Sequence, residues 1–133
     1  MIILRQSTAR VIALEHGFYD KTDGVTPEGA LTITNEKIHM DLSPADAAVA
    51  PSKILDNVTA ATTGDNALNY LSTTAGTMTL ALTASNTATL GSGVIRIIDT
   101  ANHCPVEQAF KIVTAEVFDS LERGIGVPAS SWV

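Results

Sequence analysis

The stretch Thr77-Met-Thr-Leu-Ala-Leu82 alternates without a break between small side chains and large apolar ones. Successive side chains of a β-strand point to opposite faces, so this period of two predicts a strand with Met78, Leu80 and Leu82 on its buried face. The stretch therefore indicates a β-rich fold, and the segments on either side of it are interpreted from there.

Short apolar segments separated by turn residues lie on both sides of this strand. They predict further strands at residues 9–18, 31–34, 37–42, 54–55, 58–62, 67–71, 94–98 and 106–113. Residues 43–52 predict a loop and residues 85–91 a short helical turn. Thr114 is a suitable N-cap for a helix over residues 115–123, whose apolar residues share one face.

Short strands with turn residues about every 8–12 positions are typical of a β-sandwich with Greek-key connections. The length of 133 residues fits one domain spanning 1–133. The two ends, 1–8 and 125–133, are predicted to be extended segments outside the compact part. The predicted core residues are Leu80, Leu82, Leu90, Ile95, Ile97 and Phe110.

The composition excludes several classes of protein. With 45% hydrophobic and 17% charged residues, the chain is unlike a disordered one. The net charge of −6 disfavours binding to a phosphate backbone, so no nucleic-acid partner is expected. The sequence has no apolar run of membrane-spanning length and no signal peptide at its start. These features predict a protein made in the cytoplasm that has no membrane partner.

The sequence shows little site chemistry. Its three histidines, His16, His39 and His103, are not at metal-ligand spacing, and a single cysteine, Cys104, cannot form a thiolate cluster. The acidic segment 20–28 lacks the alternating ligands of a calcium loop. We therefore expect no catalytic residue, no cofactor and no metal. The melting temperature should then be insensitive to a chelator, with Asp20, Asp23 and Glu28 as the first residues to reconsider if it is not.

The order of several sequence blocks resembles a domain of tailed-bacteriophage structural proteins, described as tail-fibre-like or virion accessory proteins. The resemblance extends over nearly the whole chain. The blocks are Leu4-Arg-Gln-Ser-Thr-Ala-Arg10, Phe18-Tyr-Asp-Lys-Thr-Asp-Gly24, Ala30-Leu-Thr-Ile-Thr34, Leu82-Thr-Ala-Ser-Asn-Thr-Ala-Thr-Leu-Gly91, Pro105-Val-Glu-Gln-Ala-Phe110 and Ala115-Glu-Val-Phe-Asp-Ser-Leu121.

The resemblance implies an Ig-like antiparallel β-sandwich with a short C-terminal helix, the base domain of a longer fibre. It brings no catalytic residues. Because the sequence has no fibre segment after the helix, the resemblance implies an adaptor, anchoring or decoration subunit on the phage head, neck or tail. The expected partners are other virion proteins and further copies of the chain, and the expected location is the virion.

Apolar residues near both ends predict how such a subunit would assemble, because extended segments can add to the sheet edge of a neighbour. The expected interface residues are Ile2, Ile3, Leu4, Ile125, Val127 and Trp132. Two alternatives stay open. Both ends could instead complete the sheets and core of their own domain. The chain could also be a carbohydrate-binding module that uses Tyr70 or Trp132.

Overall fold

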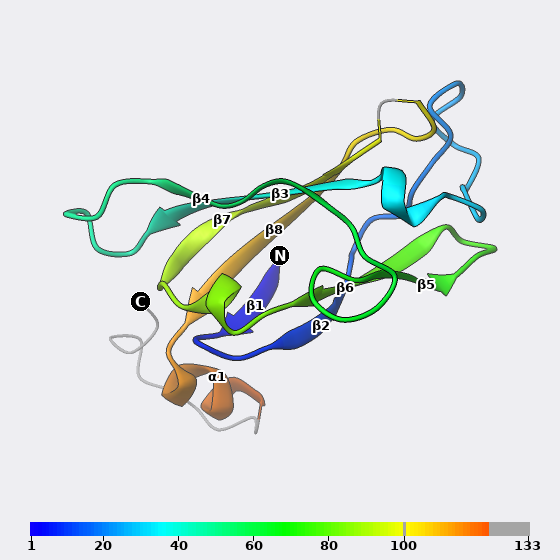
Figure 1. Ribbon diagram of the computed structural model, residues 1–133. Helices are drawn as coiled ribbons and strands as arrows, with labels where there is room; N and C mark the ends of the chain where they lie inside the picture. The colour runs from blue at the N-terminus through cyan, green and yellow to red at the C-terminus, as the bar shows by residue number, and fades with distance from the viewer. Residues whose placement is uncertain (100, 123–133) are drawn as a thin grey trace.

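The computed structural model describes residues 1–99 and 101–122. Within this part of the chain, eight strands form two sheets, accompanied by one α-helix and two short 3-10 turns (Figure 1). The elements are β1 (Ile2–Arg5), β2 (Arg10–Ala13), η1 (Ile33–Asn35), β3 (Lys37–Pro44), β4 (Ser52–Thr59), β5 (Leu68–Ser72), β6 (Thr77–Leu82), η2 (Ser85–Thr87), β7 (Gly91–Ile98), β8 (Val106–Val113) and α1 (Ala115–Glu122). The predicted mainly β class with one short helix is confirmed.

The two sheets lie face to face. The larger has the strand order β1-β8-β7-β3-β4 and the smaller the order β2-β6-β5. The decisive stretch, residues 77–82, forms β6 at the centre of the small sheet, where Leu80 lies opposite Ile12 of β2 and Leu68 of β5. Its alternation is confirmed, because Met78, Leu80 and Leu82 are at most 3% exposed.

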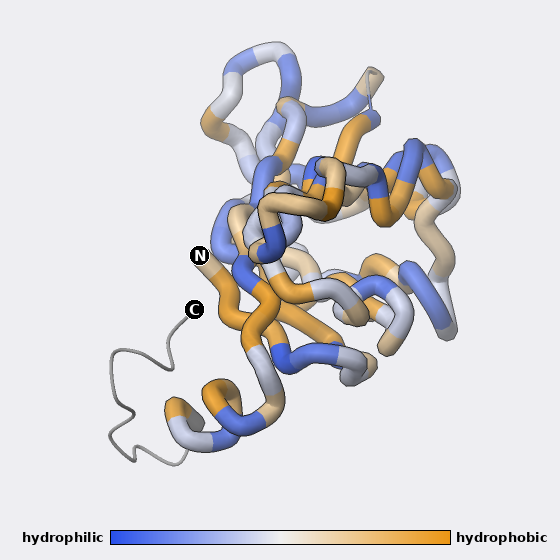
Figure 2. The backbone as a smooth tube through the Cα atoms, turned by 90° about the vertical axis from the view of Figure 1, so that its left-hand side faces the viewer, coloured by the Kyte–Doolittle hydropathy of each residue, from blue (hydrophilic) through white to orange (hydrophobic). Residues whose placement is uncertain are grey.

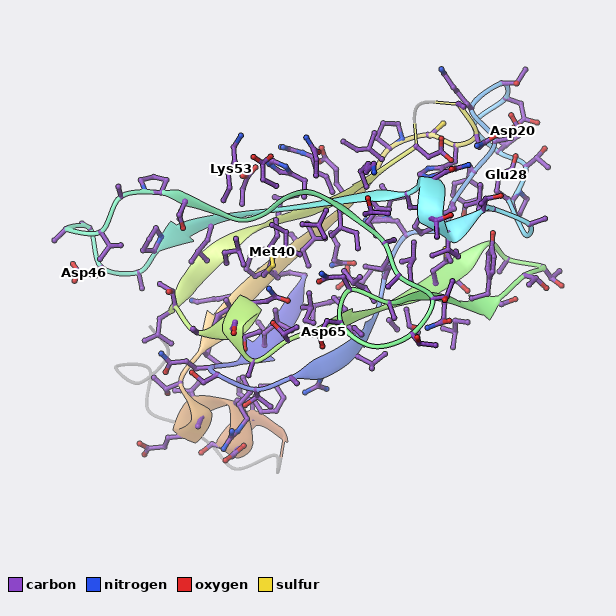
Figure 3. All side chains as sticks on the ribbon, viewed as in Figure 1. Asp20, Glu28, Met40, Asp46, Lys53 and Asp65 are labelled. Carbon is purple, nitrogen blue, oxygen red and sulfur yellow. The ribbon has the colours of Figure 1, made fainter. Side chains whose placement is uncertain are left out.

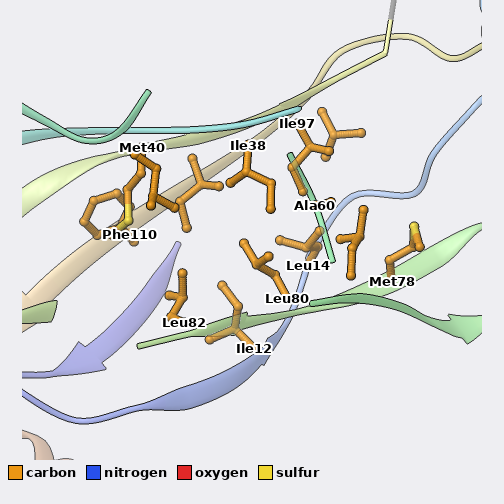
Figure 4. Close-up of a cluster of buried hydrophobic side chains, with 14 of the residues drawn as sticks. Ile12, Leu14, Ile38, Met40, Ala60, Met78, Leu80, Leu82, Ile97 and Phe110 are labelled. Atoms are coloured by element: carbon orange, nitrogen blue, oxygen red, sulfur yellow. The ribbon is translucent and has the colours of Figure 1, made fainter. Parts of the chain in front are cut away.

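A single apolar core fills the space between the sheets (Figure 4). Both sheets contribute to it, and Figure 3 shows Met40 of β3 inside it while Lys53 of β4 projects from the outer side. Of the predicted core residues, only Leu90 is not fully buried, and it packs against the core from η2's end of the sandwich. The buried members include Leu4, Phe18, Ile38, Met40, Leu68, Met78, Leu80, Ile95, Ile97, Phe110 and Ile112.

The N-terminal residues differ from the prediction. Residues 2–5 are not a free extended segment but form β1, which pairs in parallel with β8, Leu4 lying opposite Ile112. The large sheet is therefore mixed rather than wholly antiparallel. The reason is burial: Leu4 is fully buried and Ile2 packs against the same core, so docking β1 removes apolar surface from water.

Two further segments differ in type or length. Residues 31–34, predicted as a strand, do not form one. Residues 33–35 form the 3-10 turn η1, after which the Glu36 N–H donates to the carbonyl of Ile33. The two short strands predicted at 54–55 and 58–62 are replaced by one strand, β4, which ends at Thr59 and has register shifts against β3. Asn57 in β4 has φ = 51°, a left-handed conformation that Asn tolerates and that interrupts the local alternation.

Helix α1 packs on the outside of the sandwich beside β1 (Figure 2). Thr114 caps it as predicted: its Oγ1 accepts a hydrogen bond from the Val117 N–H at 3.3 Å. Val117 and Phe118 form a small second cluster with Val113, and Ile3 and Leu121 cover this cluster. Within the described residues, no helix has the length and apolar character needed to cross a membrane.

Candidate functional site

Three titratable side chains converge inside the end of the sandwich that carries the segment 17–28. Glu36 immediately precedes β3, Asp99 immediately follows β7, and His103 lies between β7 and β8. Their residues are 0%, 7% and 1% exposed. One side-chain oxygen or nitrogen of each lies within 4.8 Å of those of the other two. Among the described residues, this is the group of histidine and acidic side chains that lie close enough together to hold one metal ion.

The hydrogen bonds of His103 fix the orientation of its ring. Its Nδ1 lies 2.6 Å from the carbonyl oxygen of Cys104. A carbonyl can only accept, so Nδ1 carries a hydrogen and donates it. The other ring nitrogen, Nε2, faces Oε1 of Glu36. In the neutral imidazole with this tautomer, Nε2 presents a lone pair to the cluster.

Asp99 is held by two local donors. The Ala101 N–H donates to Oδ1 at 3.1 Å, and the Asn102 side-chain amide donates to Oδ2 at 2.8 Å. Burial raises the pKa of Asp99, but the hydrogen bonds from Asn102 and its other neighbours outweigh that effect, and the pKa lies below its usual value. Asp99 therefore stays ionised inside the fold.

Glu36 is less well satisfied. Its Oε2 atom is buried and has no hydrogen-bond partner among the described residues. Burial raises the pKa of Glu36, and the facing carboxylate of Asp99 raises it further against the opposing effect of His103. Burial lowers the pKa of His103, but the contact with Glu36 outweighs it and the pKa is raised. The cluster thus favours the binding of a positive charge, either as protons on Glu36 and His103 or as a cation.

The segment 17–28 closes over the cluster. The ring of Phe18 packs edge-on against His103, with 4.8 Å between the ring centroids. The Cys104 N–H donates to the carbonyl of Tyr19, and the Glu28 N–H to the carbonyl of Phe18. These contacts exclude solvent from the cluster. Figure 3 places Asp20 and Glu28, in the segment 17–28, at this end of the molecule.

Sequence reasoning missed this cluster. The dispersed histidines predict no closed set of metal-ligating side chains, but folding brings Glu36 to His103 from 67 positions away and places Asp99 beside them. The acidic segment 20–28 is not a comparable group. Asp23 accepts hydrogen bonds from the Val25 and Thr26 N–H groups and the Thr26 hydroxyl, so its carboxylate closes its own turn. The signal for the cluster in the sequence was the presence of acidic residues next to strand ends, Glu36 before β3 and Asp99 after β7.

His103 and Cys104 have different partners, as their adjacency predicts. The Cys104 thiol lies 3.7 Å from the carbonyl oxygen of Asp20. Tyr70, a candidate sugar-binding residue, donates its hydroxyl hydrogen to the Glu28 carbonyl at 2.7 Å and accepts from the Leu31 N–H at 3.0 Å. Its hydroxyl therefore anchors the segment 28–31 to β5.

The predicted assembly residues divide into two groups. Leu4 is buried in the core, and Ile2 and Ile3 are half-buried against the core and against α1 respectively. In the structure, the N-terminal end therefore completes the sheet and core of its own domain, which is one of the two alternatives that the sequence leaves open. Ile125, Val127 and Trp132 lie outside the described residues.

The outer faces of the two sheets differ in charge. The outer face of the large sheet carries a network in which Arg96 contacts both Asp41 and Glu107, while His39 contacts Asp41 and lies 3.6 Å from Asp56. Strands β5 and β6 carry no charged residue at all. In β2, Arg10 is charged and exposed, and its guanidinium lies over the Phe118 ring of α1. The outward-facing side chains of the small sheet that alternate with the buried ones are uncharged and include Val11 and Leu71, which are 64% and 62% exposed.

The chain matches no protein-family model and no curated protein.

Proposed function

We propose that the chain is a non-enzymatic structural subunit of a tailed-bacteriophage particle, an adaptor, anchoring or decoration protein that binds neighbouring virion subunits. The observation that carries the proposal is the order and spacing of the six sequence blocks, which extend over nearly the whole chain. The single β-sandwich is compatible with this role, because the blocks fall on elements of one fold rather than on separate units.

The strand order supports an Ig-like topology for this subunit. Variable-type immunoglobulin domains place strands G, F, C and C′ in one sheet and B, E and D in the other. The order β8-β7-β3-β4 facing β2-β6-β5 corresponds to that arrangement, with β1 added beside β8. The disulfide between the two sheets of antibody domains has no counterpart, since the chain has one cysteine.

The uncharged outer face of the small sheet is the surface that we assign to the neighbouring subunit. Removing a charged group from water on docking is costly, whereas burying Val11 and Leu71 is favourable by about 1.5–3 kcal/mol each. The ion-pair network of the large sheet suits a solvent-facing side. The subunit would therefore lie with β2, β6 and β5 toward its neighbour.

Particles of the phage or prophage that encodes the chain provide the first test. Peptides of the chain should be found by mass spectrometry in purified particles, in amounts comparable to those of other structural proteins. Absence from purified particles would overturn the proposal.

Matched substitutions test the docking face. Val11→Lys and Leu71→Lys should reduce incorporation into particles at least tenfold, because each places a charge in the proposed contact. Val25→Lys is the control, since Val25 is 73% exposed and lies in the segment 17–28. All three purified variants should keep their stability to within about 0.5 kcal/mol, as exposed sites usually do. Equal incorporation of all three variants would place the contact elsewhere.

A further inference from the structure

The buried cluster of Glu36, Asp99 and His103 is not needed to explain a docking subunit, and its chemistry points elsewhere. Buried ionisable groups are costly unless they are paired or coordinate a metal. Here two carboxyl groups and one imidazole share a site from which solvent is excluded. We propose that these three side chains bind one divalent transition-metal ion, for which Zn²⁺ is the probe.

The orientation of His103 is the first argument. Histidines that bind a metal through one ring nitrogen usually donate the other N–H to a carbonyl or a carboxylate, which fixes the tautomer. His103 does this: Nδ1 donates to the Cys104 carbonyl at 2.6 Å, so Nε2 is directed into the cluster with a lone pair. Asp99 is oriented in the same way, by the amide of Asn102 at 2.8 Å.

The unpartnered oxygen of Glu36 is the second, independent argument. Oε2 is fully buried and accepts no hydrogen bond from the described residues, although a carboxylate oxygen in this setting normally has a partner. A cation bound beside it would supply the missing interaction. The facing side chain of Asp99 is also a carboxyl group, so without a cation the two groups can bond only through a shared proton.

The charge and donor types select the class of ion. Two ionised carboxylates and a neutral imidazole carry a charge of −2, which one divalent cation cancels without any further group. Imidazole with carboxylates suits zinc and other first-row transition metals, whereas Ca²⁺ prefers six to eight oxygen ligands. Zn²⁺ binds such atoms at about 2.0–2.2 Å, so atoms within 4.8 Å of one another can share one ion after a movement of about an ångström.

The position in the fold indicates what the ion would do. The three ligands join the start of β3, the end of β7 and the turn before β8, and the segment 17–28 covers them. A site buried to this extent has no open approach for a substrate. The ion would therefore be structural, holding one end of the sandwich together, as closed metal sites do.

Metal binding by the wild-type chain is the direct test. Protein stripped with a chelator, without an affinity tag that binds metals, is dialysed against Zn²⁺ and its bound zinc is measured by elemental analysis. We expect one zinc ion per chain, a melting temperature raised by several degrees, and visible absorption bands when Co²⁺ replaces Zn²⁺. Mg²⁺ and Ca²⁺ should give no comparable shift. Failure to retain any of the transition metals would overturn the proposal and leave a cluster held by protons.

Variants locate the ion. His103→Gln removes a ligand and should abolish stoichiometric binding. Because that variant alters a buried site, Asn102→Ala is the second test: Asn102 is exposed, yet its amide orients Asp99. Loss of such an outer partner typically lowers metal affinity by about 10–100-fold. His39→Gln is the matched control, since His39 forms the surface His–carboxylate pair with Asp41. Loss of zinc in His39→Gln, or its retention in both other variants, would place the ion elsewhere and contradict the proposal.

Discussion

Gly93 in β7 has no room for a larger residue. A methyl group there would lie 1.8 Å from the Asp41 carbonyl oxygen and 2.8 Å from the Cζ atom of Phe110. We expect Gly93→Ala to lower the free energy of unfolding by about 3 kcal/mol or more, since overpacking in a well-packed sheet forces the backbone apart. Chemical denaturation measures this value.

Gly64 is the control for that substitution, because it separates steric overlap from backbone conformation. Gly64 has φ = 78° and nothing within 4 Å of an added methyl group. Gly64→Ala should therefore cost only the left-handed conformation, about 1–2 kcal/mol. Equal losses at both glycines would contradict the close approach of β7 to β3.

Leu82 was predicted from alternation alone to be buried, and it is 3% exposed. Leu82→Ala should therefore lower the free energy of unfolding by about 2–5 kcal/mol. Ala81 is the preceding residue of β6 and its side chain points to the outer face of the sheet. Ala81→Ser should therefore have little effect. A small loss for Leu82→Ala would contradict the packing of β6 against the core.

Among the secondary-structure elements, β1 is the strand for which the sequence prediction is wrong: the prediction places residues 1–8 outside the compact part, whereas β1 pairs with β8. A chain lacking residues 1–5 would lose the buried Leu4, the pairing with β8 and the cover of α1 by Ile3. We expect this deletion to leave the protein largely unfolded by circular dichroism, rather than folded and unable to assemble. Loss of the Arg5–Asp119 ion pair contributes little to this destabilisation, because exposed ion pairs contribute about 0–1 kcal/mol to the free energy of unfolding. Arg5→Ala is therefore the mild control.

The elements that could be predicted from the sequence are those whose evidence is local. The alternation in β6 and β8 and the cap at Thr114 each lie within a few residues, and these elements were found with nearly their observed bounds. The β1–β8 pairing joins positions 2 and 110, and the cluster joins positions 36 and 103. Such contacts depend on the closure of the whole sandwich, so no local pattern contains them. Residues 31–34 show the opposite error: their composition is typical of a strand, but they form none, and residues 33–35 form a 3-10 turn.

At the scale of the whole molecule, the last prediction concerns the C-terminal segment. The core described here extends from Leu4 to Ile112, and α1 is anchored by its own cluster through Phe118. A chain ending after residue 124 should therefore unfold cooperatively, with a melting temperature close to that of the full chain. Because Ile125, Val127 and Trp132 are predicted assembly residues, the same truncated chain should be incorporated into particles poorly.

The two measurements on this truncated chain separate the possible roles of the segment 125–133. A folded chain that no longer enters particles assigns the segment to the contact with neighbouring subunits, in addition to the face carrying Val11. An unfolded truncated chain would instead assign it to the domain's own packing, as the structure does for residues 2–5. A folded chain that assembles normally would leave the uncharged face of β2, β6 and β5 as the proposed contact, which the substitutions at Val11 and Leu71 test independently.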